Sequence, residues 1–366
     1  MFGLFETGFE SISIGQAVML CVAGVLLFLA IVKKIEPLLL GPMGFAALLA
    51  NLPLTGATDP GGFMNLIYYG LIRTSLIPLF IFLGIGTMTD FSPLLAKPVT
   101  FLLGAAAQVG IFVAVGVAVL LGFTLPQAAS IGIIGGADGP TTIYVATRLA
   151  PEILGPVTVA AYSYMALVPL IQPPIIRALT TKKMRCTEMA KLREVSTAEK
   201  VIFPISVTII VGMVIPSAVP LVGMMMIGNL FRVSGVMDRL SKTGGNEIMN
   251  IATILLGLGI GYMMTAKLFL NLDTIKILML GIVAFSAATA GGVIIGLIMY
   301  KATKGKINPM IGSAGVSAVP MAARVVQKQA TKDKPGNFVL MQAMGPNVAG
   351  VIGSACAAGI LLGLLM

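Results

Sequence analysis

One acidic residue, Asp138, lies in the middle of a long apolar stretch. It is the only charged side chain between Lys97 and Arg148, and it stands in the motif GGADGPTT. A carboxylate at the centre of a membrane helix costs about 2.5–3.5 kcal/mol on insertion scales, so acids at such positions mark functional sites. The position of Asp138 therefore predicts a functional carboxylate inside a membrane.

The residues around Asp138 indicate what it binds. Glycines and Pro140 interrupt the helix, and an interrupted membrane helix leaves backbone carbonyls that need a partner. These carbonyls, the carboxylate and the hydroxyls of Thr141 and Thr142 form a set of hard oxygen atoms suited to Na⁺, with H⁺ as the competitor. The alternative is a kinked helix in which Asp138 pairs with a buried arginine.

A second interrupted stretch, INPMIGSAGVSAVPMAAR (307–324), has no acid. It offers neutral oxygen ligands from Asn308, Ser313 and Ser317, and Gly312 allows close backbone approach. Two broken segments that meet at the midplane of the membrane, one with the charge and one with neutral oxygens, would form a cation site. For Ser313 and Gly312, tight helix packing is an equally good explanation.

Three further polar residues have both a functional and a structural interpretation. Arg324 ends the second broken stretch and is either a clamp for a carboxylate or a topology anchor. Tyr164 lies in AYSYMALVPLIQPP, where a helix would turn Tyr162 and Tyr164 about 200° apart, so only one of them faces the site. Asn347, near the end of the chain, either lines the cavity or bridges helices.

Composition defines the kind of protein that holds these residues. Hydrophobic residues make up 57% of the 366 residues and charged residues 10%, whereas soluble domains have about 25% charged residues. The chain has no His, and its three Cys form no CxxC pair, which argues against His catalysis and a zinc or iron–sulfur site. The net charge of +10 is attributed to cytoplasmic loops and not to nucleic-acid binding.

The pattern of apolar runs predicts an all-α polytopic membrane protein with a single membrane-embedded domain over residues 1–366. Runs long enough to cross a membrane predict about nine to eleven membrane segments, including interrupted or re-entrant helices. The two interrupted segments are expected at 126–147 and 307–323. Basic loops, above all residues 177–200, are expected on the cytoplasmic side.

Two short sequence words recur in the same order. LGIG at 83–86 returns at 258–261, and IGGADG at 134–139 resembles IGSAG at 311–315. We therefore expect two repeats, at about 60–176 and about 235–366. The first copy is flanked by stretches poor in positive charge and the second by basic loops, which predicts an inverted-topology pair. In this interpretation 126–147 enters from outside and 307–323 from the cytoplasm; broken helices that cross the membrane fully are the alternative.

Five long motifs resemble those of one family, the β subunits of the sodium-pumping, biotin-dependent decarboxylases. These complexes act on oxaloacetate, methylmalonyl-CoA, glutaconyl-CoA or malonate. The motifs are LGIGTMTDFSPLLAKP (83–98), GIIGGADGPTTIYVA (132–146), AYSYMALVPLIQPPI (161–175), INPMIGSAGVSAVPMAARV (307–325) and AMGPNVAGVIGSACAAG (343–359).

The resemblance implies a reaction that composition does not show: a translocase that decarboxylates carboxybiotin, consumes a proton and exports Na⁺. The implied partners are a carboxyltransferase (α) subunit, a biotin carrier protein and a small membrane subunit of the γ or δ type, with a homo-oligomer also possible. The chain has no Met-Lys-Met biotin-attachment motif, so carboxybiotin would arrive on a partner. The implied location is the bacterial or archaeal cytoplasmic membrane.

The resemblance also implies roles for individual residues. Catalytic roles fall to Asp138, Tyr164 and Ser317, and carboxybiotin binding falls to Arg324. The implied Na⁺ site comprises Asp138, Asn308, Ser317 and Gly312, with support from Thr141, Thr142, Ser313 and Asn347. The alternative from the residues alone is a Na⁺-coupled carboxylate symporter without chemistry.

Overall fold

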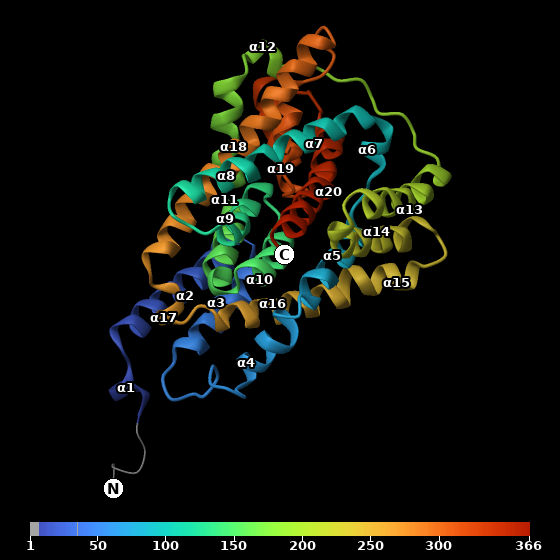
Figure 1. The fold of residues 1–366 in the computed structure, drawn as a ribbon. Helices are drawn as coiled ribbons and strands as arrows, with labels where there is room; N and C mark the ends of the chain where they lie inside the picture. The colour runs from blue at the N-terminus through green and yellow to red at the C-terminus, as the bar shows by residue number, and fades with distance from the viewer. Residues whose placement is uncertain (1–6, 35) are drawn as a thin grey trace.

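Helices form every regular element in the part of the chain that the computed structural model describes, namely residues 7–34 and 36–366 without the side chains of Met165 and Ala166 (Figure 1). In this part, 6 helices are long and apolar enough to cross a membrane. They are α2 (Ile14–Ile31), the run Pro98–Leu120, α13 (Thr197–Val214), the run Pro216–Val233, α18 (Leu272–Ala302) and α20 (Leu340–Leu365).

Two bent helix pairs raise this number to 8 if each pair is one span. The first joins Phe63–Ile72 to α5 (Leu76–Met88) with a bend of 64°, and the second bends by 62° within α11 (Leu154–Leu179). The chain is therefore an all-α, multi-pass membrane protein, as the sequence predicts. The expected number of nine to eleven segments, which includes shorter interrupted ones, stays a prediction.

Exposed apolar side chains identify the surface that faces lipid. On α13, Ile209 and Ile210 are each 60% exposed and Met213 is 82% exposed. Soluble proteins rarely leave apolar patches of this kind open to water. The scattering of such residues over several helices is what a bilayer environment requires.

The first interrupted segment breaks at Ala137 and Asp138. Helix α9 (Leu125–Gly132) continues as a 3₁₀ turn, η3 (Ile133–Gly136), and α10 (Gly139–Leu149) starts again after the break. Ala137 has a left-handed backbone with φ 55° and Asp138 is extended, so neither residue continues a helix. This break lies within the predicted segment 126–147.

The second interrupted segment is less helical than the first. It consists of a 3₁₀ helix, η7 (Pro309–Gly315), an extended connection, and α19 (Met321–Asp333). Asn308 caps η7 because its Oδ1 accepts from the backbone N–H of Met310 at 3.1 Å. The extended connection lies within the predicted segment 307–323.

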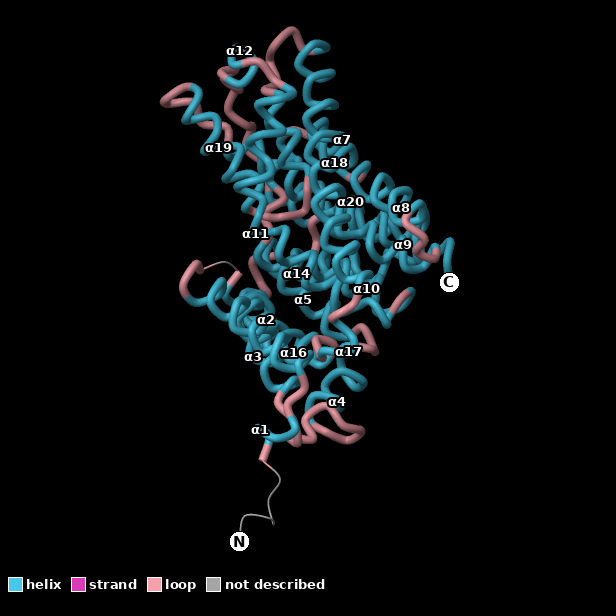
Figure 2. The backbone as a smooth tube through the Cα atoms, turned by 90° about the vertical axis from the view of Figure 1, so that its left-hand side faces the viewer, coloured by secondary structure: helices cyan, strands magenta, loops and turns pink. Residues whose placement is uncertain are grey.

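Two helices that each follow a π-helical turn pack in matching ways. Helix α5 follows a π-helical turn, η1 (Tyr68–Ile72), and α16 (Met249–Tyr262) follows another, η6 (Gly244–Ile248). Helix α5 packs against η6 and α14 (Val219–Val233), and α16 packs against η1 and α3 (Pro37–Asn51). Figures 1 and 2 both place α3 beside α16.

Short elements complete the chain. They are α1 (Gly8–Ser11), α4 (Phe63–Ile67), α6 (Ser92–Ala96), η2 (Pro98–Thr100), α7 (Phe101–Ala107), α8 (Val109–Leu120), η4 (Pro151–Ile153), α12 (Lys182–Arg185), η5 (Pro216–Ala218), α15 (Asp238–Thr243) and α17 (Ala266–Phe269). In Figure 1, α12 and the upper end of α18 lie at one end of the molecule and α4 at the other.

Helix α18 holds both interrupted segments in place. It packs against α11, α8, η3 and η7. Gly292 of α18 lies so close to Gly312 of η7 that a Cβ on either residue would collide with the carbonyl oxygen of the other. The contact supports the packing interpretation of Gly312.

We expect Gly292→Ala to destabilise the protein. Overpacking costs about 1–3 kcal/mol, and here the obstacle is backbone, which cannot rotate away. The matched control is Gly116→Ala in α8, where a Cβ would meet nothing within 4 Å and alanine gains helix propensity. Thermal unfolding of the purified protein in detergent measures both; equal midpoints for the two variants would contradict the close approach.

Candidate functional site

The carboxylate of Asp138 is buried at the start of α10, with the residue 5% exposed. Its Oδ1 accepts from the backbone N–H of Thr141 at 3.2 Å, and its Oδ2 accepts from the hydroxyl of Ser354 at 2.7 Å. An acid at this position satisfies a free N–H of the helix and interacts favourably with the helix dipole. These contacts orient the carboxylate but leave its charge without a counter-ion.

No basic side chain pairs with Asp138 in the described part of the chain. The nearest arginine in sequence, Arg148, lies over the ring of Tyr144 at 4.5 Å from its centre. The alternative of a buried Asp–Arg pair is therefore wrong. A buried carboxylate without a cation is unfavourable, so this site requires a proton or a bound cation.

The two interrupted segments meet beside Asp138. The backbone N–H of Ser317 donates to the carbonyl oxygen of Gly136 at 2.9 Å. The hydroxyl of Ser317 donates to the hydroxyl of Ser354 at 3.0 Å, and Ser354 in turn bonds Asp138. Ser317, Ser354 and Asp138 thus form one buried chain of hydrogen bonds between the second broken segment, α20 and α10. We call these three residues the Asp138 cluster.

The two threonines after Asp138 are both fully buried. The hydroxyl of Thr142 donates to the backbone carbonyl of Asp138 at 2.8 Å, so it is occupied within its own helix. The hydroxyl oxygen of Thr141 has no hydrogen-bond partner among the described residues. Of these two threonines, Thr141 is the one with capacity for a further ligand.

Asn308 is buried but has its hydrogen bonds outside the Asp138 cluster. Its Nδ2 donates to the carbonyl oxygens of Arg185 and Thr187, each at 2.9 Å. These contacts attach the start of η7 to the basic loop 177–200. Ser313 is also occupied elsewhere, because its hydroxyl donates to the carbonyl of Met310 at 2.7 Å.

An ion pair reinforces this attachment of the loop. Arg185 Nε and Asp333 Oδ2 lie 2.8 Å apart, and Lys334 pairs with Glu188 at 2.6 Å. Burial alone would raise the pKa of the Asp333 carboxyl, but hydrogen bonds from Arg185 and Gln329 hold this pKa below its usual value. The basic loop 177–200 is thus in contact with the C-terminal end of α19.

Asn347 bridges α20 to the second broken segment. Its Nδ2 donates to the carbonyl oxygens of Ala314 at 2.9 Å and Val316 at 2.7 Å. The side chain is fully buried, and its Oδ1 has no partner in the described part of the molecule. The bridging interpretation of Asn347 therefore has direct structural support.

The two tyrosines of α11 face different neighbours. The hydroxyl of Tyr164 donates to the backbone carbonyl of Leu278, and its ring packs on Gly281 of α18. The ring of Tyr162 packs on Gly139, the residue that follows Asp138; a Cβ on that glycine would lie 2.6 Å from the Tyr162 hydroxyl oxygen. The contacts place Tyr162, and not Tyr164, against the Asp138 turn.

Arg324 lies in the first turn of α19 and is exposed. Its guanidinium makes no ion pair or side-chain hydrogen bond with the described residues. The structure thus leaves Arg324 accessible, seven residues after Ser317.

Sequence reasoning missed Ser354, which makes the shortest hydrogen bond to Asp138. A signal was available, because Ser354 follows Asn347 by two helical turns and so shares its face of α20. Nothing in the sequence alone tells that this face meets the break at Asp138, since that contact depends on how distant helices pack.

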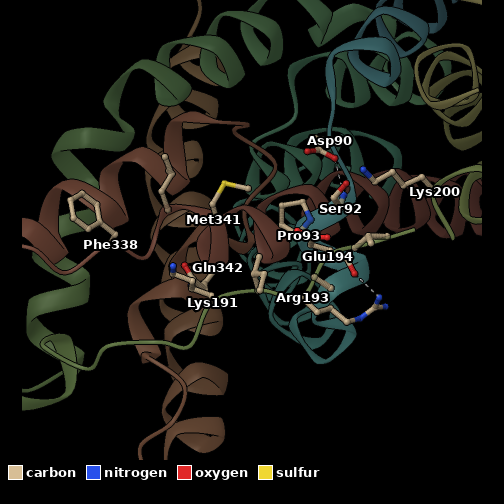
Figure 3. Close-up of a pocket in the computed structure, with 14 residues that line it drawn as sticks. Asp90, Ser92, Pro93, Lys191, Arg193, Glu194, Lys200, Phe338, Met341 and Gln342 are labelled. Carbon is tan, nitrogen blue, oxygen red and sulfur yellow. Dashed lines mark hydrogen bonds between the residues drawn. The ribbon is translucent and has the colours of Figure 1, made fainter. Parts of the chain in front are cut away.

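A cavity of about 840 Å³ lies apart from the Asp138 cluster (Figure 3). Cations and acids both line it, among them Lys191, Lys200 and Asp90. None of the residues that the sequence nominates for the site is in its lining. Burial opposes ionisation of Asp90, but hydrogen bonds from Ser92 and nearby cations hold its pKa below the usual value.

Fold and site together define the class: an all-α, multi-pass membrane protein with an unpaired carboxylate buried where two interrupted helices meet. Residues 15–365 match the family model described as "Na+-transporting oxaloacetate decarboxylase beta subunit". The chain belongs to this family of decarboxylase β subunits, and it is a decarboxylase and translocase subunit of a multisubunit enzyme.

Relatives with three different names support the same family. The chain is 56% identical to the methylmalonyl-CoA decarboxylase subunit beta of Veillonella parvula, over 98% of this chain and 96% of the relative. It is 57% identical to the glutaconyl-CoA decarboxylase subunit beta of Acidaminococcus fermentans, with the same coverage. It is 49% identical to the oxaloacetate decarboxylase beta chain 2 of Salmonella typhi, over 97% and 96%.

We expect Ser354→Ala to destabilise the protein more than Ser317→Ala. The first change removes a donor from a buried carboxylate, which costs about 1–3 kcal/mol, whereas Ser317 reaches Asp138 only through Ser354. The double variant should therefore cost less than the sum of the two single variants.

Thermal unfolding of the four forms tests this double-mutant cycle. Ser130→Ala is the matched control, because Ser130 is equally buried and its hydroxyl bonds only Pro126 in its own helix. Strict additivity of the Ser317 and Ser354 effects would show that the hydrogen-bond chain does not act as a unit.

Proposed function

We propose that this chain decarboxylates carboxybiotin delivered by a partner biotin carrier, consumes a proton and couples this to export of Na⁺. One observation carries the proposal: Asp138 is a buried carboxylate with two hydrogen-bond donors and no basic partner, at the junction of both interrupted segments. Membership of the family of Na⁺-transporting decarboxylase β subunits supports the same function.

The proposed reaction balances with one proton. The bond between the biotin nitrogen and the carboxylate carbon breaks, CO₂ leaves, and the nitrogen takes a proton to become N–H. Asp138 binds either Na⁺ or that proton, because one buried carboxylate stabilises one positive charge. Arrival of the proton therefore displaces Na⁺, which couples the two fluxes.

Other residues take roles around Asp138 in this proposal. Ser317 contributes a neutral oxygen and orders Ser354, while Arg324 binds the carboxylate of carboxybiotin. An exposed arginine with no internal partner suits the second role, since its guanidinium binds a carboxylate through two parallel hydrogen bonds. Tyr164, Asn308 and Gly312 make their contacts away from the Asp138 cluster. Proton donation by Tyr164 and Na⁺ binding by Asn308 and Gly312 therefore stay predictions.

The proposal includes the setting of the reaction. The partners are a carboxyltransferase subunit, a biotin carrier protein and a small membrane subunit, and the site is reached from the cytoplasmic side of a bacterial or archaeal cytoplasmic membrane. The contact between loop 177–200 and the C-terminal end of α19 supports one common side for both. A symporter without chemistry is disfavoured, because the relatives reported above are all decarboxylase subunits.

We also propose that the chain contains two inverted-topology repeats. The π-helical turns before α5 and α16, and the matching contacts α5–α14 and α16–α3, support an internal duplication. A duplicated pair of bundles gives a natural means of alternating access, in which one moves against the other around a fixed site.

We expect Asp138→Asn to abolish Na⁺-dependent turnover. The amide keeps the shape of the side chain and an acceptor for Thr141 but loses the charge, so transport should fall by at least about 30-fold. The measurement follows CO₂ release from carboxybiotin and uptake of ²²Na⁺ in proteoliposomes. Asp59→Asn, at an exposed loop acid, is the control; unchanged pumping by Asp138→Asn would disprove the site.

We expect Arg324→Ala to impair use of carboxybiotin and not Na⁺ binding. Loss of a bidentate charged contact should raise the KM for carboxybiotin by about 10- to 100-fold, with the Na⁺ dependence unchanged. Lys328→Ala is the control, because Lys328 is an exposed cation one turn further along α19. Equal losses in both parameters, or an equal effect of Lys328→Ala, would argue against the clamp.

A further inference from the structure

Gln108 is a buried glutamine at the junction of α7 and α8, with 5% of the residue exposed. Its Nε2 donates to the backbone carbonyl oxygens of Gly104 at 2.9 Å and Gly350 at 3.4 Å. A carbonyl oxygen can only accept, so these two bonds establish which end of the amide is the nitrogen. The amide oxygen, Oε1, is the end that remains for another partner.

The Gln108 amide lies next to the Asp138 cluster. A Cβ placed on Gly136 would be 3.5 Å from Gln108 Oε1 and 3.1 Å from the Cβ of Ser354. A Cβ on Gly353 would be 3.0 Å from Gln108 Nε2. Gly136 and Gly353, which lack a Cβ, thus make room for the Gln108 amide beside Ser354, the serine that donates to Asp138.

Oε1 of Gln108 has no hydrogen-bond partner among the described residues. A buried acceptor without a donor is unfavourable, and such groups in native proteins usually have a water or an ion as partner. A cation satisfies two needs at once here, because the neighbouring carboxylate also lacks a positive partner. A neutral amide oxygen adds to the coordination of a cation without a second negative charge.

We propose that Oε1 of Gln108 is a ligand of the Na⁺ bound at Asp138, so that the junction of α7 and α8 is part of the ion site. The inference rests on the proposed function, since it assumes that Asp138 binds Na⁺. The site then takes its charge from the first broken segment and a neutral oxygen from a helix outside both broken segments.

Two substitutions distinguish the contribution of the Gln108 amide oxygen to Na⁺ binding from that of the amide nitrogen. Gln108→Met removes both atoms at similar length, and we expect the Na⁺ dissociation constant to rise roughly 10- to 100-fold. Gln108→Glu keeps an oxygen in place of Oε1, and at alkaline pH we expect it to bind Na⁺ at least as tightly as the parent. Isothermal titration of the full-length chain in detergent with NaCl measures this without turnover.

Gln342→Met is the matched control. Gln342 is 7% exposed, lies in α20 and donates its Nε2 to the carbonyl of Ala190 at 3.0 Å, away from the Asp138 cluster. We expect parental Na⁺ binding from this variant. Equal weakening by Gln342→Met and Gln108→Met would overturn the assignment, because it would reflect general loss of a buried amide.

The remaining outcomes distinguish the inference from the function on which it rests. Two outcomes overturn the ligand role: Gln108→Met binds Na⁺ with the affinity of the parent, or Gln108→Met and Gln108→Glu lose equal affinity. In either case the buried amide serves to bind a water or to donate its two hydrogen bonds. Asp138→Asn in the same titration should lose Na⁺ binding. If Asp138→Asn binds Na⁺ like the parent, the proposed site at Asp138 fails. If Asp138→Asn loses Na⁺ binding while Gln108→Met keeps it, only the ligand role of Gln108 is excluded.

Discussion

The hydrogen bonds at the break in the first interrupted segment are the contacts on which the arrangement of the site depends. The carbonyl of Gly136 accepts from Ser317, and the carboxylate of Asp138 accepts from Ser354. Breaking a helix inside a membrane exposes backbone groups that lipid cannot satisfy. Each broken segment is therefore tolerated because the other one, with α20, supplies the missing partners.

The sequence predicts the parts of this arrangement that are local. Asp138 is recognisable because it is alone in an apolar run, and the breaks at 126–147 and 307–323 follow from glycine and proline. The choice among polar neighbours is not local: Ser354, Gln108 and Tyr162 reach the break through packing of distant helices. Asn308 illustrates the same limit. Its side-chain oxygen suits an ion ligand, but its amide nitrogen is bonded to the carbonyls of Arg185 and Thr187.

The position of Asn308 gives the second broken segment a connection to the basic loop. Asn308 and Asn337 both donate to the carbonyls of Arg185 and Thr187, and Arg185 pairs with Asp333. A displacement of η7 must therefore either carry this loop with it or break several hydrogen bonds. Substitution of Asn308 would therefore loosen the second broken segment from the loop without removing a contact of Asp138.

The scarcity of charge around Asp138 is a condition for the coupling that we propose. If a second acid stood beside Asp138, one Na⁺ and one proton could be held together, and arrival of one would not displace the other. If a basic residue paired with Asp138, neither cation would be needed. In the proposed mechanism, the one carboxylate beside Ser354 and Thr141 binds a single positive charge, and competition between Na⁺ and H⁺ for that carboxylate would link proton consumption to release of Na⁺.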